Sequence, residues 1–319
     1  MLVEMEYVYA VYREKSFSKA AQRLFISQSA VSAMVRKVEK KIGQPIFDRS
    51  TIPLTVTEEG RSYIAFVEEF ALLEKNMEAY FKDLTGLKTG HLVVGSSSFL
   101  CVYYLVDLVK RFKQKYPGVS VDLREGNMEE LRYGLMEGSI NLLLETALPE
   151  NEEIERCLFD YEHIILGVPA DYEVNKKLRD YQMTFDEVKA GKMLDPEFPA
   201  VALRQFCRYP FIFLKKQNDI YLRSMDMCRD AGFTPYVEVY LDQIMTAYYV
   251  AGSGAGITFI RSSLLNLVAK TDSLVYYKLG HNLAKRKVCL SYKKGRYLSR
   301  AARAFLELSG VKIQEEREQ

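Results

Sequence analysis

The sequence predicts an α/β protein in three parts: an N-terminal winged helix-turn-helix, a long linker helix and a C-terminal two-lobed α/β domain. Residues 16–38 have the pattern of two short helices joined by a tight turn. Residues 58–84 repeat apolar side chains at alternating spacings of three and four, and the remainder alternates strand and helix patterns. The predicted parts are residues 1–57, 58–90 and 91–319.

The composition is that of an ordinary globular protein with a locally basic N-terminus. The 319 residues are 48% hydrophobic and 27% charged, and the net charge is only +2. Residues 1–57 hold nine Lys and Arg against five Asp and Glu, so the remainder is close to neutral. This uneven charge favours local contact with phosphate groups over indiscriminate coating of nucleic acid.

The sequence offers neither a catalytic set nor a metal site. Its three His lack metal-ligand spacing, and no Ser/His/Asp set, paired acid dyad or phosphate-binding Gly-Lys motif occurs. The glycines at 252, 254 and 256 precede a strand pattern, which excludes a dinucleotide-binding loop. We therefore predict that the chain is not an enzyme and holds no resident cofactor.

Cysteine usage and targeting signals bear on the compartment. We expect buried free thiols, with a redox switch as the lesser alternative, at Cys101, Cys157, Cys207, Cys228 and Cys289. The chain starts without a signal-peptide pattern, and it has no run of about 18 apolar residues. A cytoplasmic location without a membrane partner is the expectation.

Three helix patterns fill residues 1–42. Apolar side chains recur at helical spacing through residues 1–14. The second helix has a small apolar face at Ala20, Ala21 and Leu24. Ser27 suits the N-cap of a third helix, and Gly43 suits its left-handed C-terminus. The buried face of the third helix is predicted at Val31, Val35, Val38 and Ile42.

Another face of the third helix carries Gln28, Ser32 and Arg36, four residues apart, without apolar bulk or an acid. Such a face suits the major groove of DNA, with Gln28 and Ser32 at base edges and Arg36 at a base or phosphate. A solvated polar face is the alternative, and it is the commoner one for such a face taken alone. The candidate DNA contacts on this helix and its cap are Ser27, Gln28, Ser29, Ser32, Ala33 and Arg36.

A β-wing is predicted after the third helix. Two short strand patterns lie at 44–49 and 53–57, around a tip at residues 50–52. Arg49 is a further candidate DNA contact, because its guanidinium could reach a phosphate or the minor groove. A plain surface arginine is the alternative.

The motifs of the first 60 residues follow one another in a specific order and spacing. They are Phe17-Ser18-Lys19-Ala20-Ala21-Gln22-Arg23-Leu24, Ser27-Gln28-Ser29-Ala30-Val31-Ser32, Val38-Glu39, Gly43, Phe47-Asp48-Arg49 and Leu54-Thr55-Val56-Thr57-Glu58-Glu59-Gly60. In these motifs the chain resembles the LysR-type transcriptional regulators. That family often has Arg or Gln after Ser32, where this chain has Ala33 and Met34, so fewer side chains are available for base readout.

A long helix is predicted from residue 58, with Thr57 as its cap and acidic residues in its first turn. Its apolar positions are Tyr63, Phe66, Phe70, Leu73, Met77, Tyr80 and Leu84. A heptad spacing kept this long favours pairing with a second copy, which would make a dimer. Packing against the chain's own body is the alternative. Residues 85–90, polar and with two glycines, are expected to form a hinge.

Strand and helix patterns alternate from residue 91, which predicts a parallel sheet with right-handed crossovers. The predicted strands are 91–95, 119–124, 140–145, 164–169, 211–214, 237–241, 256–260, 274–279 and 288–292. The predicted helices are 99–116, 128–137, 220–231, 242–250, 262–268 and 299–308.

Two sheet-and-helix lobes joined by crossing strands resemble the effector domain of the LysR family, a fold shared with periplasmic solute-binding proteins. Lobe one is placed at about 91–166 and 268–319, and lobe two at about 167–267. Gly254-Ala255-Gly256-Ile257 matches a family motif, but Arg261 stands where the family usually has Pro. The long stretch before the strand at 211 predicts an insertion near residues 176–203.

Ligands of open parallel sheets bind outside the carboxyl ends of the strands. Ser96, Ser97 and Ser98 occupy such a place, where hydroxyls and a helix N-terminus suit a carboxylate, sulfate or other small anion. Simple N-capping is the alternative. The resemblance places the effector cleft here, between the lobes, with Thr146 after the third strand facing the same cleft.

The resemblance implies a ligand-responsive, sequence-specific DNA-binding regulator. Its expected partners are double-stranded promoter DNA, a small-molecule effector, a second copy or a tetramer of this chain and, for an activator, RNA polymerase. A solute-binding module with a merely dimerising N-terminal domain and a catabolic enzyme using the cleft are the alternatives. The absent secretion signal disfavours the first, and the absent catalytic set disfavours the second.

Overall fold

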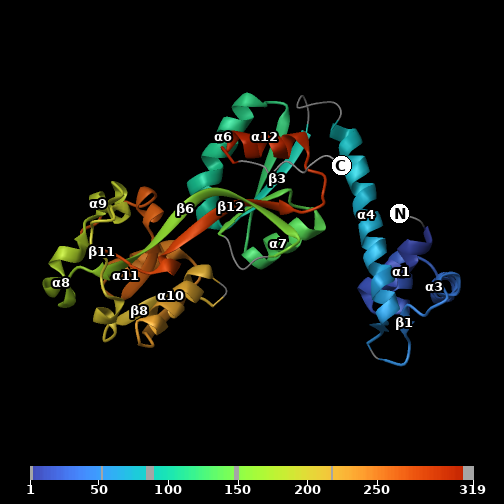
Figure 1. Cartoon of the computed structure of the whole chain (residues 1–319), viewed down its shortest axis with the longest axis horizontal. Helices are drawn as coiled ribbons and strands as arrows, with labels where there is room; N and C mark the ends of the chain where they lie inside the picture. Colours follow the sequence, from blue (N-terminus) through green and yellow to red (C-terminus); the bar gives the residue numbers. More distant parts are fainter. Residues whose placement is uncertain (1–2, 52, 84–89, 147–150, 217, 312–319) are drawn as a thin grey trace. The chain divides into compact units, whose positions relative to one another are not determined.

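A computed structural model describes residues 3–51, 53–83, 90–146, 151–216 and 218–311 (Figure 1). The chain divides into two compact units. The first runs through the long helix α4 and includes residues 295–299, and the second holds the rest of the C-terminal part. The hinge expected at 85–90 lies almost wholly outside the described residues.

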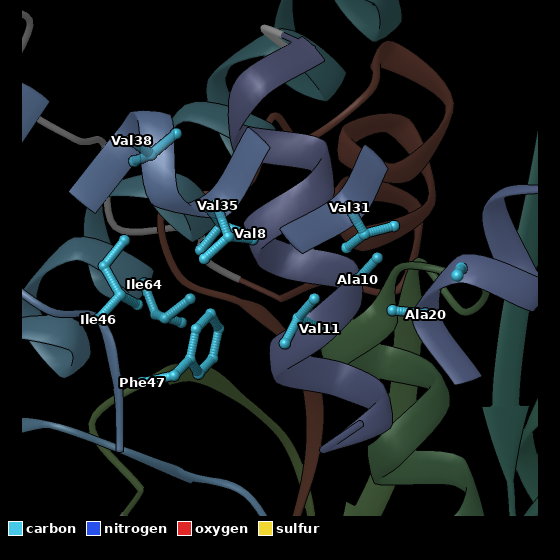
Figure 2. Packing of buried hydrophobic residues seen from close by; sticks show 11 residues of the cluster. Val8, Ala10, Val11, Ala20, Val31, Val35, Val38, Ile46, Phe47 and Ile64 are labelled. Atoms are coloured by element: carbon cyan, nitrogen blue, oxygen red, sulfur yellow. The ribbon is translucent and has the colours of Figure 1, made fainter. Parts of the chain in front are cut away.

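The first unit confirms the expected helix-turn-helix. Its elements are α1 (Val3–Glu14), α2 (Phe17–Leu24), α3 (Gln28–Ile42), β1 (Phe47–Asp48), β2 (Thr55–Val56) and α4 (Glu58–Asp83). Val8 and Val11 of α1 pack with Val31 and Val35 of α3 in one core (Figure 2). Ile64 of α4 joins the same core, so the start of the long helix is part of this domain.

Local caps explain why these helices begin and end where they do. The Ser27 hydroxyl accepts a hydrogen bond from the backbone of Ala30 at 3.2 Å, as an N-cap should. Phe25 ends α2 in the left-handed conformation at φ 57°, and Gly43 ends α3 at φ 78°. The Thr57 hydroxyl accepts from the backbone of Gly60 at 2.9 Å and so caps α4.

The wing is present, but its strands are shorter than predicted. β1 and β2 pair antiparallel over only two residue pairs, Phe47 with Val56 and Asp48 with Thr55. The Asp48 carboxylate accepts hydrogen bonds from the backbone and hydroxyl of Ser50, which turns the chain out of the first strand early. Residue 52 of the tip lies outside the described residues.

Lobe one of the second unit is a sheet in the order β4-β3-β5-β12-β6. Its strands are β3 (Gly90–Ser96), β4 (Val119–Glu125), β5 (Leu142–Thr146), β6 (Ile154–Pro169) and β12 (Lys285–Lys293). β3 pairs parallel with β4 and β5, whereas β12 runs antiparallel to β5 and β6. The helices α6 (Val106–Lys115), α7 (Met128–Glu137) and α12 (Arg300–Leu308) belong to this lobe.

The helix predicted at 99–116 is one helical run with a change of winding inside it. It comprises α5 (Ser98–Leu100), a π-helical segment (Cys101–Leu105) and α6. Tyr103 lies in the π-helical segment and stacks on Phe99, with ring centroids 5.7 Å apart. π-Helical turns are often found at functional sites. In this one, the Tyr103 hydroxyl accepts a hydrogen bond from Asn266 at 3.2 Å.

Lobe two is a sheet in the order β7-β11-β6-β10-β8-β9. Its further strands are β7 (Gln182–Met183), β8 (Pro210–Leu214), β9 (Tyr236–Leu241), β10 (Ile257–Arg261) and β11 (Leu274–Lys278). Its main helices are α10 (Asp219–Asp230) and α11 (Ile244–Gly252). β8 pairs parallel with β9 and β10, and β10 is antiparallel to β6.

The crossing strands differ most from the prediction. β6 begins at Ile154, ten residues before the predicted strand, and it runs through both lobes (Figure 1). Its pairing changes from β12 to β10 and β11 after His163. β11 lies in lobe two, so the chain returns to lobe one after Lys278 and not near residue 267.

The segment predicted as an insertion is folded into lobe two. Short elements fill it and the residues beside it, at α8 (Val174–Lys177), Arg179–Tyr181, β7, α9 (Phe185–Lys189), Lys192–Leu194 and Leu203–Phe206. A capping box between Thr184 and Glu187 starts α9. None of the helices in the described part of the chain combines the length and hydropathy that a membrane span requires.

Candidate DNA-binding face and effector cavity

The polar face predicted on α3 is exposed. Gln28 and Arg36 are exposed and Ser32 is half-buried, while Val31, Val35 and Val38 are buried on the opposite side. The helix is therefore anchored through one face and presents an acid-free face to solvent. That arrangement meets the geometric requirement for insertion into a major groove.

The remaining candidates on α3 gather around its N-terminus and its exposed side. The Ser27 and Ser29 hydroxyls lie 2.9 Å apart, and the Gln28 side chain accepts a hydrogen bond from Ser18 at 3.1 Å. Ala33 is exposed and brings only a methyl group to the surface. Ser18 therefore orients Gln28 from α2, which sequence spacing did not indicate.

Arg49 lies against the protein. Its guanidinium contacts the Glu39 carboxylate at 2.8 Å and lies 5.1 Å from the centroid of the Phe17 ring. Glu39 also accepts hydrogen bonds from the backbone of Ile46 and Phe47, so it ties α3 to the wing. Arg49 would have to leave Glu39, wholly or in part, to contact a phosphate.

The apolar stripe predicted along α4 is largely uncovered within its unit. Phe66 is 66% exposed, Leu73 65% and Met77 53%, whereas Val67 is buried and Ile64 is buried in the domain core. A row of exposed apolar side chains on one helix is unusual in a monomer and marks an interaction surface. Leu84, the last predicted position of the stripe, lies outside the described residues.

A cavity of about 380 Å³ lies between the two lobes. Ser97 and Ser98 line it from lobe one together with Thr146, while Asp219 and Arg261 line it from lobe two. Ser96, the fourth predicted effector contact, is fully buried, and its hydroxyl donates to the carbonyl of Leu144 at 2.6 Å. The structure therefore places Ser96 in the sheet beneath the cavity.

The hydroxyls that line the cavity differ in the hydrogen bonds that they make. Ser97 occupies the N-cap position of α5, but its side chain makes no capping hydrogen bond. Ser98 donates to the exposed Glu125 carboxylate. Thr146 donates to Asp219 at 3.2 Å and so connects lobe one to lobe two.

A buried ionic network lies against this cavity. Arg286 of β12 binds Glu162 of β6, with its Nε donating at 2.7 Å, and it also binds Asp219 of α10. Arg261 contacts Glu162 at 3.3 Å, and Arg223 contacts Asp219 at 2.9 Å. The network thus contains three guanidinium groups and two carboxylates.

The ionisation of the network follows from burial opposed by opposite charge. Burial alone would raise the pKa of Glu162, but Arg261 and Arg286 outweigh it and leave that pKa below the ordinary value of 4.5. Burial and the neighbouring Arg286 lower the pKa of Arg261 to about 10, against the opposing effect of Glu162. Arg286 differs, because Glu162 and Asp219 outweigh its burial and raise its pKa above the ordinary value.

Arg261 also keeps an unmet hydrogen-bonding capacity. The residue is 6% exposed, and among the described residues no acceptor reaches its buried Nε. Its guanidinium lies 4.7 Å from the centroid of the Phe99 ring. A buried donor without a partner is costly, so an acceptor that reached this Nε would relieve the cost.

Sequence reasoning missed the network. Glu162 and Arg286 lie 124 residues apart in the chain, and neither belongs to a motif. The surrounding residues gave no signal, because Glu162 follows Asp160 and Tyr161, and Arg286 lies between two lysines. Within the described residues no group of His, Cys, Asp and Glu is arranged to hold a metal ion.

Fold and site together define a two-domain protein, with a DNA-binding helix-turn-helix joined to a two-lobed small-molecule-binding domain. A family model described as LysR substrate binding domain matches residues 85–310, and one for the bacterial regulatory helix-turn-helix protein, lysR family, matches residues 2–61. The chain belongs to the LysR family of transcriptional regulators. It is thus a ligand-responsive regulator and not an enzyme.

The relatives agree with this assignment. An HTH-type transcriptional regulator of Bacillus subtilis, YcgK, is 27% identical over 96% of this chain and 92% of its own length. The RuBisCO operon transcriptional regulator of Allochromatium vinosum is 25% identical over 93% of this chain and 91% of its own length. HinK, a LysR family regulator from Pseudomonas aeruginosa, has a solved structure with a TM-score of 0.55, 19% identity and 97% of both chains covered.

Proposed function

We propose that this regulator responds to a small anionic effector held in the inter-lobe cavity, with Arg261 as its main charged contact. The unmet Nε of Arg261 is the observation that carries the proposal. The network contributes one more positive than negative charge, and Lys215, which also lines the cavity, is already paired with Asp242 at 2.8 Å. A single negative charge beside Arg261 would balance this excess.

The hydroxyls of Ser97, Ser98 and Thr146 would orient the anion. Ser97 can donate without breaking a capping bond, and Ser98 and Thr146 could exchange a carboxylate partner for the ligand. Ser96 supports the site from below, because its hydroxyl holds the end of β3 to β5. The exposed Glu125 carboxylate would disfavour a second negative charge at its side of the cavity.

On DNA, the α3 face would read base edges with Gln28 and Ser32 and contact a base or phosphate with Arg36. Ser27, Ser29 and Ala33 would line the same groove, and Arg49 would contact a backbone phosphate from the wing. Two copies paired along α4 would place two such faces on a symmetric pair of half-sites. The exposed apolar stripe of α4 supports this pairing, whether the final assembly is a dimer or a tetramer.

Effector binding would change how the lobes lie against one another and so change the spacing or bend of bound DNA. Thr146 and Asp219 already bridge the lobes across the cavity, so a ligand there competes with an inter-lobe contact. We further propose that the protein acts in the cytoplasm, and that an activating form would contact RNA polymerase.

A thermal-shift screen tests the anionic effector. Carboxylates, sulfate and phosphate, with neutral analogues, are compared at fixed ionic strength on the wild type, Arg261→Met and the exposed control Arg208→Met. We expect at least one anion to raise the melting temperature of the wild type and of the control, but not of Arg261→Met. Stabilisation that survives in Arg261→Met, or that comes only from neutral molecules, would contradict the proposal.

A further inference from the structure

The two crossing strands present different chemistry on their two faces. β6 and β12 are antiparallel here, with Glu162 opposite Arg286 and His163 opposite Lys285. Because successive side chains of a strand point to opposite faces, His163 and Lys285 lie on the face away from the Glu162–Arg286 pair. The rear face of the crossing strands is therefore basic behind the inter-lobe network.

A second cavity, of about 430 Å³, opens on this rear face. Its lining includes His163 from β6, Lys278 from the end of β11, His281, and Lys285 from the start of β12. The lining also includes Met193 and Leu194, apolar residues of the segment predicted as an insertion. All four ionisable side chains of the lining are basic, and the lining contains no carboxylate.

Few of these basic groups are neutralised. Lys278 donates to the backbone carbonyls of Asp195 and Phe198, at 2.6 and 2.9 Å, which hold the ammonium in place but leave its charge. Lys285 lies 4.3 Å from the centroid of the Tyr161 ring. Among the residues that the structure describes, His281 alone of the four has an ion-pair partner, Asp230 at 3.0 Å.

The surroundings of the His163 imidazole show how charge is distributed around this cavity. Its side chain makes no hydrogen bond with any residue in the described ranges. Burial lowers the pKa of His163 most, followed by Lys285, while Asp160 and Glu162 oppose this and Lys278 adds a smaller lowering effect. The imidazole is therefore half-buried beside the two lysines of the cavity lining.

We propose that this rear cavity binds a small, multiply charged oxyanion, a phosphate group or a polycarboxylate. Two lysines held as point charges and a free imidazole suit an oxygen-rich anion with more than one negative charge. The site is distinct from the inter-lobe cavity, because the β6–β12 pair separates them. Its occupant would contact both crossing strands and the Lys192–Leu194 turn. It would therefore connect the segment predicted as an insertion to the strands that join the lobes.

Imidazole NMR on the full-length chain tests this site. The chain has only three histidines, His91, His163 and His281, so selective labelling of the imidazole Cε1 gives three assignable signals. We expect inorganic phosphate, against chloride at matched ionic strength, to raise the pKa of His163 by about 1, since an opposite charge nearby favours the protonated form. Citrate in place of phosphate distinguishes a polycarboxylate site from a phosphate site. The exposed His91, on lobe one, should not respond.

Matched variants locate the effect. Lys285→Gln should weaken phosphate binding, followed through His163, by about tenfold. Lys287→Gln removes the same charge two residues along β12 and outside the cavity lining, so it should leave binding unchanged. Arg261→Met should also leave it unchanged, which separates this site from the inter-lobe one. The proposal is overturned if neither anion affects His163, if His91 responds equally, or if the Lys285 and Lys287 variants behave alike.

Discussion

Arg286 and Glu162 show how a pair of opposite charges can be kept in a protein interior. Each side chain is at most 1% exposed, and the guanidinium binds both Glu162 and Asp219. Taking such charges out of water is costly, and mutual hydrogen bonding offsets that cost only while every partner remains. The pair therefore makes the crossing strands sensitive to the loss of any single member.

Glu162→Gln tests this dependence at a single residue. The amide keeps the volume but leaves Arg286 and Arg261 without their shared carboxylate, so we expect unfolding to become easier by about 3–5 kcal/mol. Urea denaturation of the purified chain measures the difference. Glu197→Gln, on an exposed turn of lobe two, is the control and should change the free energy of unfolding by less than about 0.5 kcal/mol.

The same pair predicts how stability depends on pH. The pKa of Glu162 is lowered on folding, so its contribution is complete above its ordinary value of 4.5 and is lost as the pH falls through the folded pKa. Asp219 behaves alike, because Arg286 and Arg223 outweigh its burial and lower its pKa. Melting temperatures measured from pH 7 to pH 3 should fall less steeply in Glu162→Gln, and an unchanged slope would argue against this coupling.

The ion pair between Arg49 and Glu39 leads to a prediction about DNA affinity. If Arg49 contacts a phosphate, Glu39→Gln should tighten binding, because the carboxylate no longer competes for the guanidinium. Glu6→Gln removes the same charge from an exposed site on α1, so it controls for the general electrostatic gain. Fluorescence anisotropy on one duplex measures both variants, and equal affinities in the two would assign Arg49 a purely structural role.

Among the elements, α4 joins two functions in one helix. Its first turns join the DNA-binding domain core through Ile64, and Val67 is also buried, while Phe66 and Leu73 stay exposed on another face. A helix that only packed on its own domain would not need this second apolar face. The pattern therefore favours a partner helix over the alternative of packing on the chain's own body.

A charged substitution on that exposed face tests the pairing. Phe66→Glu with Leu73→Glu should convert the assembly to monomers at micromolar concentration, because carboxylates at a paired seam must be desolvated without partners. Sedimentation velocity measures the change, and circular dichroism checks that the domains remain folded. Glu69→Gln, also on the exposed side of α4, is the control, and a folded double variant that keeps its assembly state would contradict the pairing.

Elements whose pattern is local were predictable, and elements defined by distant partners were not. The third helix was expected from Ser27 to Gly43, because a cap, a buried stripe and a left-handed terminator all lie within one short segment. The first ten residues of β6 were missed, since Arg156, Asp160 and Glu162 do not resemble a buried strand. Only their pairing with β12, which lies more than 100 residues away, makes that strand.

For the whole molecule, the fold class could be predicted, and the pairing of buried charges between distant strands could not. Arg261 stood out as a departure from a family pattern. That Glu162 and Arg286 lie beside it could not be predicted before the pairing of the strands was known. Ser96 was expected beside Ser97 and Ser98, yet strand alternation turns its hydroxyl into the sheet. Spacing along the chain thus indicated residues at the inter-lobe cavity without saying which of their side chains would line it.

Footprinting of the DNA beside this chain's own gene tests the central claim most directly, namely that the exposed face of α3 reads DNA sequence. The account predicts two half-sites protected by the wild type, spaced by about 10 base pairs or a multiple of this. Protection should be lost in Gln28→Ala/Arg36→Ala. It should remain in Lys40→Ala/Gln44→Ala, which removes one basic and one amide side chain elsewhere on the domain surface. An unchanged footprint from the Gln28/Arg36 variant would contradict the account.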